Sequence, residues 1–73
     1  MTKFTELLIK VRESKHMTKT EVAQFFNWTP MYYGRYENGY LTPQGANIKK
    51  FADFMGISEK QLKEILVDTI YKK

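Results

Sequence analysis

The side chains with the clearest capacity for recognition chemistry lie between Pro30 and Arg35, within the stretch WTPMYYGRYENGY at 28–40. Arg35 carries a planar fork of donors that can bind guanine O6 and N7 bidentately in a DNA major groove. Pro30 and Met31 can only make apolar contacts, for example with thymine methyl groups, whereas Tyr32 can reach a phosphate or a base edge with its hydroxyl. An ordinary solvated charge at Arg35 is the alternative to this base-reading role.

The sequence contains no arrangement typical of an enzyme or of a metal site. It has no pairing of a nucleophile with a base, no paired carboxylates and no phosphate-binding glycine loop. Its single histidine, His16, cannot build a metal site alone, and the absence of cysteine excludes disulfides and cysteine-ligated zinc. We therefore predict no catalytic residue, no metal and no cofactor, and we expect no small-molecule effector.

Length and charge describe a single small domain over residues 1–73. A chain of this size has room for one modest hydrophobic core. Its formal net charge of +4 is compatible with a polyanionic partner, although many other domains are equally basic. No apolar run approaches the roughly 18 residues of a membrane span, and the N-terminus lacks the apolar segment of a signal peptide. We expect a cytoplasmic protein with no membrane partner.

Three helix starts share one sequence pattern. TKTE at 18–21 and SEKQ at 58–61 are capping boxes, in which a hydroxyl residue caps the helix and a side chain three residues later bonds back to it. Thr29 followed by Pro30 fits the same scheme, because proline is favoured at the first position of a helix. This proline is therefore predicted to open a helix rather than to break one.

Turn residues and apolar spacing complete the pattern. Gly39 and Gly56 are placed to end helices in the left-handed conformation, and Asn27 can adopt that conformation in a tight turn. Apolar residues spaced by three and four positions indicate helices, and no segment alternates as a strand would. We predict a compact all-α fold of five helices, with a very short turn between the second and the third. The expected ranges are 3–15, 19–26, 30–38, 44–55 and 59–69.

These motifs carry a family resemblance. MTKTEVAQFFNWTPMYYGRYENG at 17–39 and FADFMGISEKQL at 51–62 resemble the Cro/cI-type (XRE) helix-turn-helix family of phage and bacterial repressors, which has the lambda-repressor-like fold. The resemblance covers about residues 4–67 and leaves a short basic C-terminal tail at 68–73. It implies a helix-turn-helix formed by the second and third expected helices, with the third reading double-stranded DNA.

The resemblance also assigns roles outside the base-reading set. Lys19 and Thr29 take positions similar to the family's phosphate contacts, and a helix N-terminus already favours an anion. Asn38 resembles a further phosphate contact, through its side chain or its backbone N–H. Arg12 and Glu37 occupy the places of a partly buried ion pair that ties the first helix to the end of the third. Two unrelated surface charges are the alternative for this pair.

Several residues depart from the family's pattern. Pro30 and Met31 stand where polar amides are frequent, which leaves the target sequence unspecified. Tyr33 replaces an aliphatic residue and is expected to face the core, as is part of Tyr36. Gly34 stands where a small polar residue is common, and a glycine within a helix costs about 1 kcal/mol relative to alanine. We therefore expect a close approach at Gly34, either to the preceding helix or to DNA.

Two hypotheses of function follow. The leading one is a sequence-specific DNA-binding transcriptional regulator of phage, plasmid or bacterial origin, acting as a repressor in a bacterial nucleoid. It implies a homodimer, weak or assisted by DNA, on a pseudo-palindromic operator with half-sites about 34 Å apart. Candidate dimer contacts are Phe54, Ile70 and Tyr71, although Phe54 could equally complete the core. The alternative is a protein-interaction module, or an antitoxin-like regulator, whose recognition helix is modified and rich in aromatic residues.

Overall fold

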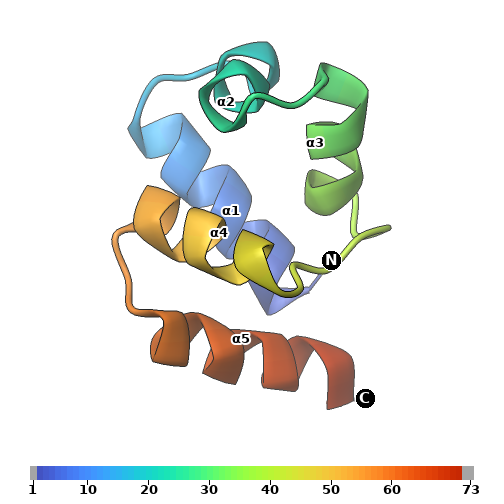
Figure 1. The fold of residues 1–73 in the computed structure, drawn as a ribbon, viewed down its shortest axis with the longest axis vertical. Coiled ribbons are helices and arrows are strands. Elements are labelled where there is room, and N and C mark those ends of the chain that lie inside the picture. Colours follow the sequence, from blue (N-terminus) through green and yellow to red (C-terminus); the bar gives the residue numbers. More distant parts are fainter. Residues whose placement is uncertain (1, 72–73) are drawn as a thin grey trace.

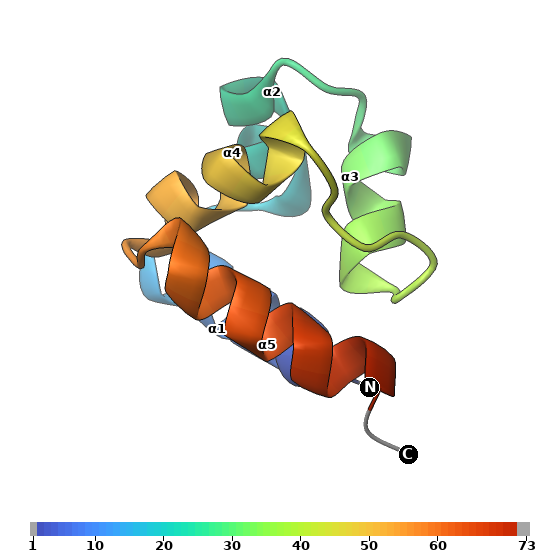
Figure 2. The same ribbon diagram turned by 60° about the horizontal axis from the view of Figure 1, so that its bottom comes forward.

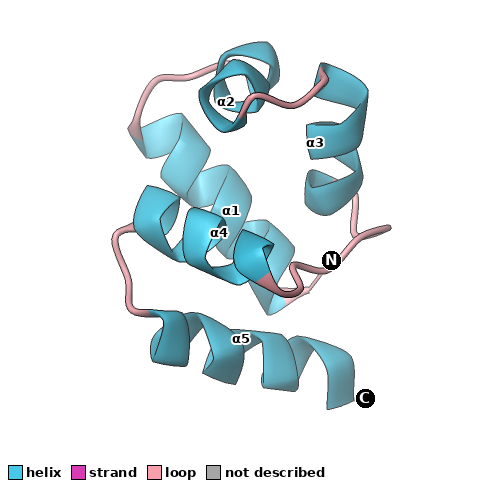
Figure 3. Ribbon diagram, viewed as in Figure 1, coloured by secondary structure: helices cyan, strands magenta, loops and turns pink. Residues whose placement is uncertain are grey.

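The computed structural model describes residues 2–71, and side chains are described for residues 2–67. This described part consists of helices joined by turns and one longer loop, and it contains no strand (Figure 1, Figure 3). Its helices are α1 Lys3–Ser14, α2 Lys19–Phe26, α3 Pro30–Glu37, α4 Ala46–Met55 and α5 Glu59–Tyr71. The predicted all-α fold with five helices is confirmed.

Four helix ends differ from the predicted ranges. α4 begins at Ala46 rather than at residue 44, because the glycine before it has a φ of +55° and lies outside the helical region. α1 and α3 end at Ser14 and Glu37, one residue early, since the following residue is the C-cap in each case. α5 continues to Tyr71 and so extends into the segment that was predicted as a tail.

The predicted helix caps are present. Thr18 Oγ1 accepts from the Glu21 N–H at 3.1 Å, while the Glu21 carboxylate accepts from the Thr18 N–H at 2.8 Å. Ser58 and Gln61 form the same reciprocal pair at the start of α5. A further capping box opens α1 with threonine at both positions, and the sequence pattern did not predict it. These side chains satisfy backbone donors that have no partner within their own helices.

The helix-turn-helix and the C-terminal helix lie at opposite ends of the molecule. In Figure 1, α2 and α3 are at the top, α5 is at the bottom, and α1 and α4 lie between them. α5 packs against α1 and α4 (Figure 2), whereas α3 packs against α2 and α1. The outward side of α3 is therefore remote from α5.

One core of interlocking aromatic rings holds these helices together. The Phe26 ring centroid lies 5.1 Å from that of Phe51 and 5.4 Å from that of Phe54, and Phe4 meets Phe51 edge-on at 5.5 Å. Phe54 is 4% exposed, so of its two predicted roles the structure shows the core one. A side chain buried to this extent has no surface to offer a second copy, which corrects its assignment as a dimer contact. The largest fully buried side chains are Tyr33, Phe4, Phe51, Leu8, Leu62 and Val22.

Candidate nucleic-acid interface

A short turn joins α2 to α3 and sets the angle between them. Asn27 adopts a φ of +63°, as predicted for a tight turn. The Trp28 N–H then donates to the Ala23 carbonyl at 2.8 Å. The Trp28 ring stacks on Phe26, with centroids 4.7 Å apart, and on Tyr36, with centroids 5.5 Å apart. The indole therefore bridges the two helices of the motif.

Arg12 and Glu37 form the ion pair that the family resemblance implied. Arg12 Nε donates to Glu37 Oε2 at 2.6 Å, and Nη2 donates to Oε1 at 3.4 Å, so the contact is bidentate. A third donor, Nη1, bonds the Met17 carbonyl at 3.1 Å. The Glu37 side chain is 2% exposed and that of Arg12 is 14% exposed, which excludes two unrelated surface charges. The hydrogen bond to Glu37 raises the pKa of Arg12, so the guanidinium stays charged.

Tyr33 adds a hydrogen bond that the sequence analysis missed. Its side chain is fully buried, as predicted, and its hydroxyl donates to Glu37 Oε2 at 2.5 Å. Burial, together with this bond to the Glu37 carboxylate, raises the pKa of Tyr33 above its ordinary value. Glu37 thus accepts hydrogen bonds from α1 and from α3 itself, which fixes the C-terminal half of α3. Such a buried network orients a helix more than it adds net stability.

Several predicted DNA-contacting residues line one shallow hollow on α3. The hollow has a volume of about 200 Å³, and its walls are Thr29, Met31, Tyr32 and Arg35. Met31 is 73% exposed, and Arg35 and Pro30 are exposed as well. The structure thus places the guanidinium and the two apolar contacts on the outward side of one helix.

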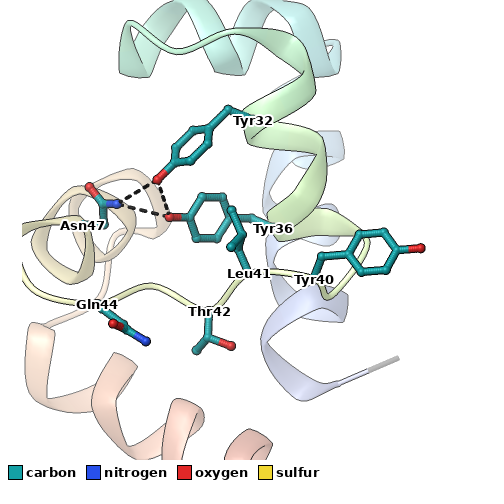
Figure 4. Close-up of a pocket in the computed structure, with 7 residues that line it drawn as sticks. All are labelled: Tyr32, Tyr36, Tyr40, Leu41, Thr42, Gln44 and Asn47. Atoms are coloured by element: carbon teal, nitrogen blue, oxygen red, sulfur yellow. Dashed lines mark hydrogen bonds between the residues drawn. The ribbon is translucent and has the colours of Figure 1, made fainter.

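Tyr32 faces this hollow only in part, which corrects its predicted outward orientation. Its side chain is half-buried, and its ring meets that of Trp28 edge-on at 4.9 Å. Its hydroxyl lies 2.9 Å from the Tyr36 hydroxyl and 3.5 Å from Asn47 Nδ2 (Figure 4). Tyr36 is fully rather than partly buried, and this burial raises the pKa of Tyr36 to about 12. Tyr32 is therefore held by α4 as well as by its own helix.

A second hollow, of about 460 Å³, opens between α3, the loop after it and the start of α4 (Figure 4). Tyr32 lines both hollows and so forms the wall between them. The sequence analysis missed Asn47, because no local spacing marks an amide at the start of α4 as a partner of tyrosines in α3. The lining residues are Tyr32, Tyr36, Tyr40, Leu41, Thr42, Gln44 and Asn47.

The three side chains predicted to contact phosphate are exposed. They differ in which polar group is left to bond a phosphate. Lys19 is the first residue of α2. Thr29 Oγ1 caps α3 by accepting from the Tyr32 N–H at 3.2 Å, which leaves the hydroxyl hydrogen for another acceptor. The Asn38 N–H donates to the Gly34 carbonyl at 2.9 Å. Of the two groups predicted at Asn38, the backbone N–H is therefore occupied, and the side chain is the available one.

The close approach predicted at Gly34 is not made to α2. A Cβ built on Gly34 would meet no described atom within 4 Å, apart from its chain neighbours and its own helix backbone. The packing alternative is therefore wrong, and an approach to DNA stays a prediction.

Phe25 and Tyr40 are exposed aromatic side chains to which the sequence analysis gave no role. Phe25 is 63% exposed, and its ring lies 5.7 Å from that of Phe54, centroid to centroid. Phe25 and Phe26 are adjacent in a helix, so both cannot face the same core, and this spacing was the available signal. The side chains of the remaining dimer candidates, Ile70 and Tyr71, lie outside the described residues.

The described part of the chain contains neither a metal-binding cluster nor a membrane-spanning helix. No group of three or more histidine, cysteine, aspartate or glutamate side chains there could hold a metal ion. None of the described helices is long and apolar enough to cross a membrane.

Comparison with known proteins agrees with this architecture. A family model described as helix-turn-helix (HTH_3) matches residues 8–62, which include all of α2, α3 and α4. Comparisons with curated proteins and with solved structures gave no significant match. The matched region contains both helices of the motif, the turn between them and the capped start of α5. The chain belongs to the Cro/cI-type (XRE) helix-turn-helix family, a family of DNA-binding regulators.

Proposed function

We propose that this protein is a sequence-specific transcriptional regulator that binds double-stranded DNA and represses transcription, reading the major groove with α3. The observation that carries the proposal is the outward side of α3, where Arg35 and Met31 share one hollow with the Thr29 cap. Arg35 is suited to guanine O6 and N7, and Met31 is suited to a thymine methyl group. The buried Arg12–Glu37 pair supports the proposal, because it fixes the helix that presents these groups.

The proposed active form is a homodimer on a pseudo-palindromic operator. One α3 reads only a few base pairs, so useful affinity requires two copies with half-sites about 34 Å apart along the duplex. The longest extent of the molecule is 30 Å, comparable with this spacing, so two copies on successive major grooves would meet only with their long axes along the duplex. Because Phe54 belongs to the core, the proposed contacts are Ile70 and Tyr71 on α5, with the dimer weak or assisted by DNA. A duplex-DNA target fits a phage, plasmid or chromosomal regulator acting in the bacterial nucleoid.

Titration of fluorescent duplexes selected from a random pool tests the proposal directly. The wild type should lose affinity steeply with rising salt, because binding releases counterions from the phosphates. Arg35→Ala should weaken binding to the selected duplex by ~1–3 kcal/mol and relax specificity at one position. Lys19→Ala should weaken all duplexes alike and reduce the salt slope by about one unit.

Lys63→Ala is the matched control for these losses of positive charge. Lys63 is exposed on α5, at the end of the molecule opposite α2 and α3 (Figure 1). Its removal should leave the affinity for a duplex that carries a single half-site within a factor of about two, because exposed charges far from the DNA are screened. If no duplex shows salt-sensitive binding by the wild type, the proposal is wrong.

A protein-interaction module is the second candidate, and the exposed apolar side chains of the motif favour it. Met31 is 73% exposed and Phe25 is 63% exposed, and methionine and aromatic residues are enriched at protein interfaces. Such a module would bind its partner with little dependence on salt, and Arg35→Ala would have little effect. The same salt titration therefore separates the two candidates.

A further inference from the structure

The cluster formed by Asn47, Tyr36 and Tyr32 has a direction of hydrogen bonding that follows from its donors and acceptors. Asn47 Nδ2 lies 3.1 Å from the Tyr36 hydroxyl and 3.5 Å from the Tyr32 hydroxyl, and the two hydroxyls are 2.9 Å apart (Figure 4). An amide nitrogen only donates, whereas a hydroxyl donates one hydrogen and also accepts. The Tyr36 hydroxyl therefore accepts from Asn47.

The hydrogen of the Tyr36 hydroxyl then has one acceptor among the described residues. Tyr36 is 3% exposed, and a buried donor without a partner is destabilising. Among the described residues, the Tyr32 oxygen is the acceptor within bonding distance of it. Burial and the bond to Tyr32 raise the pKa of Tyr36 while the bond from Asn47 lowers it, as expected for this direction. The bonds thus run from Asn47 through Tyr36 to Tyr32.

Tyr32 stands at the end of this series with its own hydrogen unused. Its oxygen accepts from Tyr36 at 2.9 Å and, more weakly, faces Asn47 Nδ2 at 3.5 Å. Two donors on one side of the oxygen direct its O–H away from them, toward open space. Tyr32 lines both hollows beside α3, so an acceptor in either hollow is within reach of this hydrogen.

We propose that Asn47 is a positioning residue that makes the Tyr32 hydroxyl an obligatory donor, so that Tyr32 selects a hydrogen-bond acceptor on the DNA. This inference rests on the proposed function. Phosphate oxygens and base-edge acceptors satisfy such a donor, whereas the amino groups of adenine and cytosine in the major groove do not. Tyr32 is therefore a specificity-determining residue, and the hydrogen bonds that Tyr36 and Asn47 donate set the orientation of its hydroxyl.

Replacing the Asn47 amide, a donor, by a carboxylate, which only accepts, tests the direction of the hydrogen bonds between Asn47, Tyr36 and Tyr32. In Asn47→Asp a carboxylate accepts from the tyrosines, so the Tyr32 hydrogen turns inward and its lone pairs face the DNA. Aspartate is favoured in the first turn of a helix, so α4 tolerates the change. The added charge by itself weakens DNA binding, and Gln44→Glu is the matched control for it. Gln44 lines the same hollow, but its side chain points away from both hydroxyls (Figure 4).

The two substitutions are compared in the wild type and in Tyr32→Phe, by titration of the selected duplex. With Tyr32 present, Asn47→Asp is expected to weaken binding roughly tenfold more than Gln44→Glu does. With Tyr32→Phe, the two substitutions should weaken binding by equal factors, because no hydroxyl remains to be turned. A purely structural role of Asn47 would instead give the same loss in both backgrounds.

The outcomes separate this inference from the proposed function. Equal losses for Asn47→Asp with and without the Tyr32 hydroxyl would overturn the inference and leave the proposed function standing. Absence of salt-sensitive binding by the wild type would overturn the proposed function, and the inference with it. Thermal melts of every variant show whether it is folded. If Asn47→Asp does not fold, Asn47→Ala replaces it, and a loss of affinity that is independent of Tyr32 again overturns the inference.

Modified duplexes identify the acceptor. Single methylphosphonates remove the charge of one phosphate, and base analogues that lack one major-groove acceptor remove a base contact. The loss caused by Tyr32→Phe should vanish on one of these duplexes and so assign the contact to the backbone or to a base. If Tyr32→Phe weakens binding equally on all of them, the inference is wrong.

Discussion

Replacing Gly34 by alanine should make the fold more stable and its binding to DNA weaker. A glycine within a helix costs about 1 kcal/mol relative to alanine. Because a Cβ on Gly34 meets no described atom within 4 Å beyond its chain neighbours and its own helix backbone, the substitution gains helix propensity without a clash. We expect the free energy of unfolding to rise by ~0.5–1 kcal/mol and the melting temperature by roughly 2–8 °C.

Gly56→Ala is the matched control, because it makes the same chemical change in an equally open position. Gly56 has a φ of +72°, whereas Gly34 lies in the regular helix α3. Alanine in the left-handed region is disfavoured by ~1–2 kcal/mol, so this control should lower the melting temperature. Gly56 ends α4, away from the outward side of α3, so the affinity of the folded protein for DNA should not change.

Thermal melts measure the effect of Gly34→Ala on stability, and duplex titrations measure its effect on DNA affinity. If DNA approaches α3 at Gly34, an added methyl group should lower affinity at least about fivefold, as overpacking does elsewhere. A lower melting temperature for Gly34→Ala would refute the reasoning about open space around this residue. An unchanged affinity would refute the idea that DNA is what approaches there.

Two further predictions concern the buried polar groups behind α3. Glu37→Gln should lower the free energy of unfolding, measured by urea denaturation, by ~2–3 kcal/mol. Arg12 then loses its charged partner, although the 14% exposure of its side chain gives it some contact with water. Unchanged stability would contradict the structural role of the pair. Stability should also fall as pH rises from 10 to about 12, because the unfolded chain then releases protons that Tyr33 and Tyr36, whose pKa values are both raised, retain in the folded state. Urea midpoints across that interval should decrease, and a constant midpoint would show that Tyr36 is not protected on folding.

The helices and their caps could be predicted because short-range interactions decide them. Thr18, Thr29 and Ser58 bond to backbone atoms three residues away, and Asn27 needs only its own backbone preference. Among the helix starts the exception is α4, where a glycine with positive φ shifted the boundary by two residues. No local sequence pattern distinguishes a glycine that enters a helix from one that stands just before it.

The orientation of Tyr32 could not be predicted, because a residue far away in sequence determines it. Helical spacing assigns Tyr32 to the outward side of α3, and the Arg12–Glu37 pair followed from family resemblance. Asn47, which holds Tyr32, lies 15 residues further along the chain and in another helix. Tertiary contacts of this kind override the period of a single helix, and the burial of Phe54 was undetermined for the same reason.

Under the proposed function, these contacts together explain how so short a helix can be specific with few polar side chains. The Arg12–Glu37 pair and Tyr33 fix the C-terminal half of α3, whereas Trp28 and Asn47 contact Tyr32 in its N-terminal half. A helix held at both ends loses little further freedom on binding, so each contact contributes more of its interaction energy to affinity. Specificity can then rest on one exposed guanidinium and one oriented hydroxyl, together with apolar contacts that exclude water.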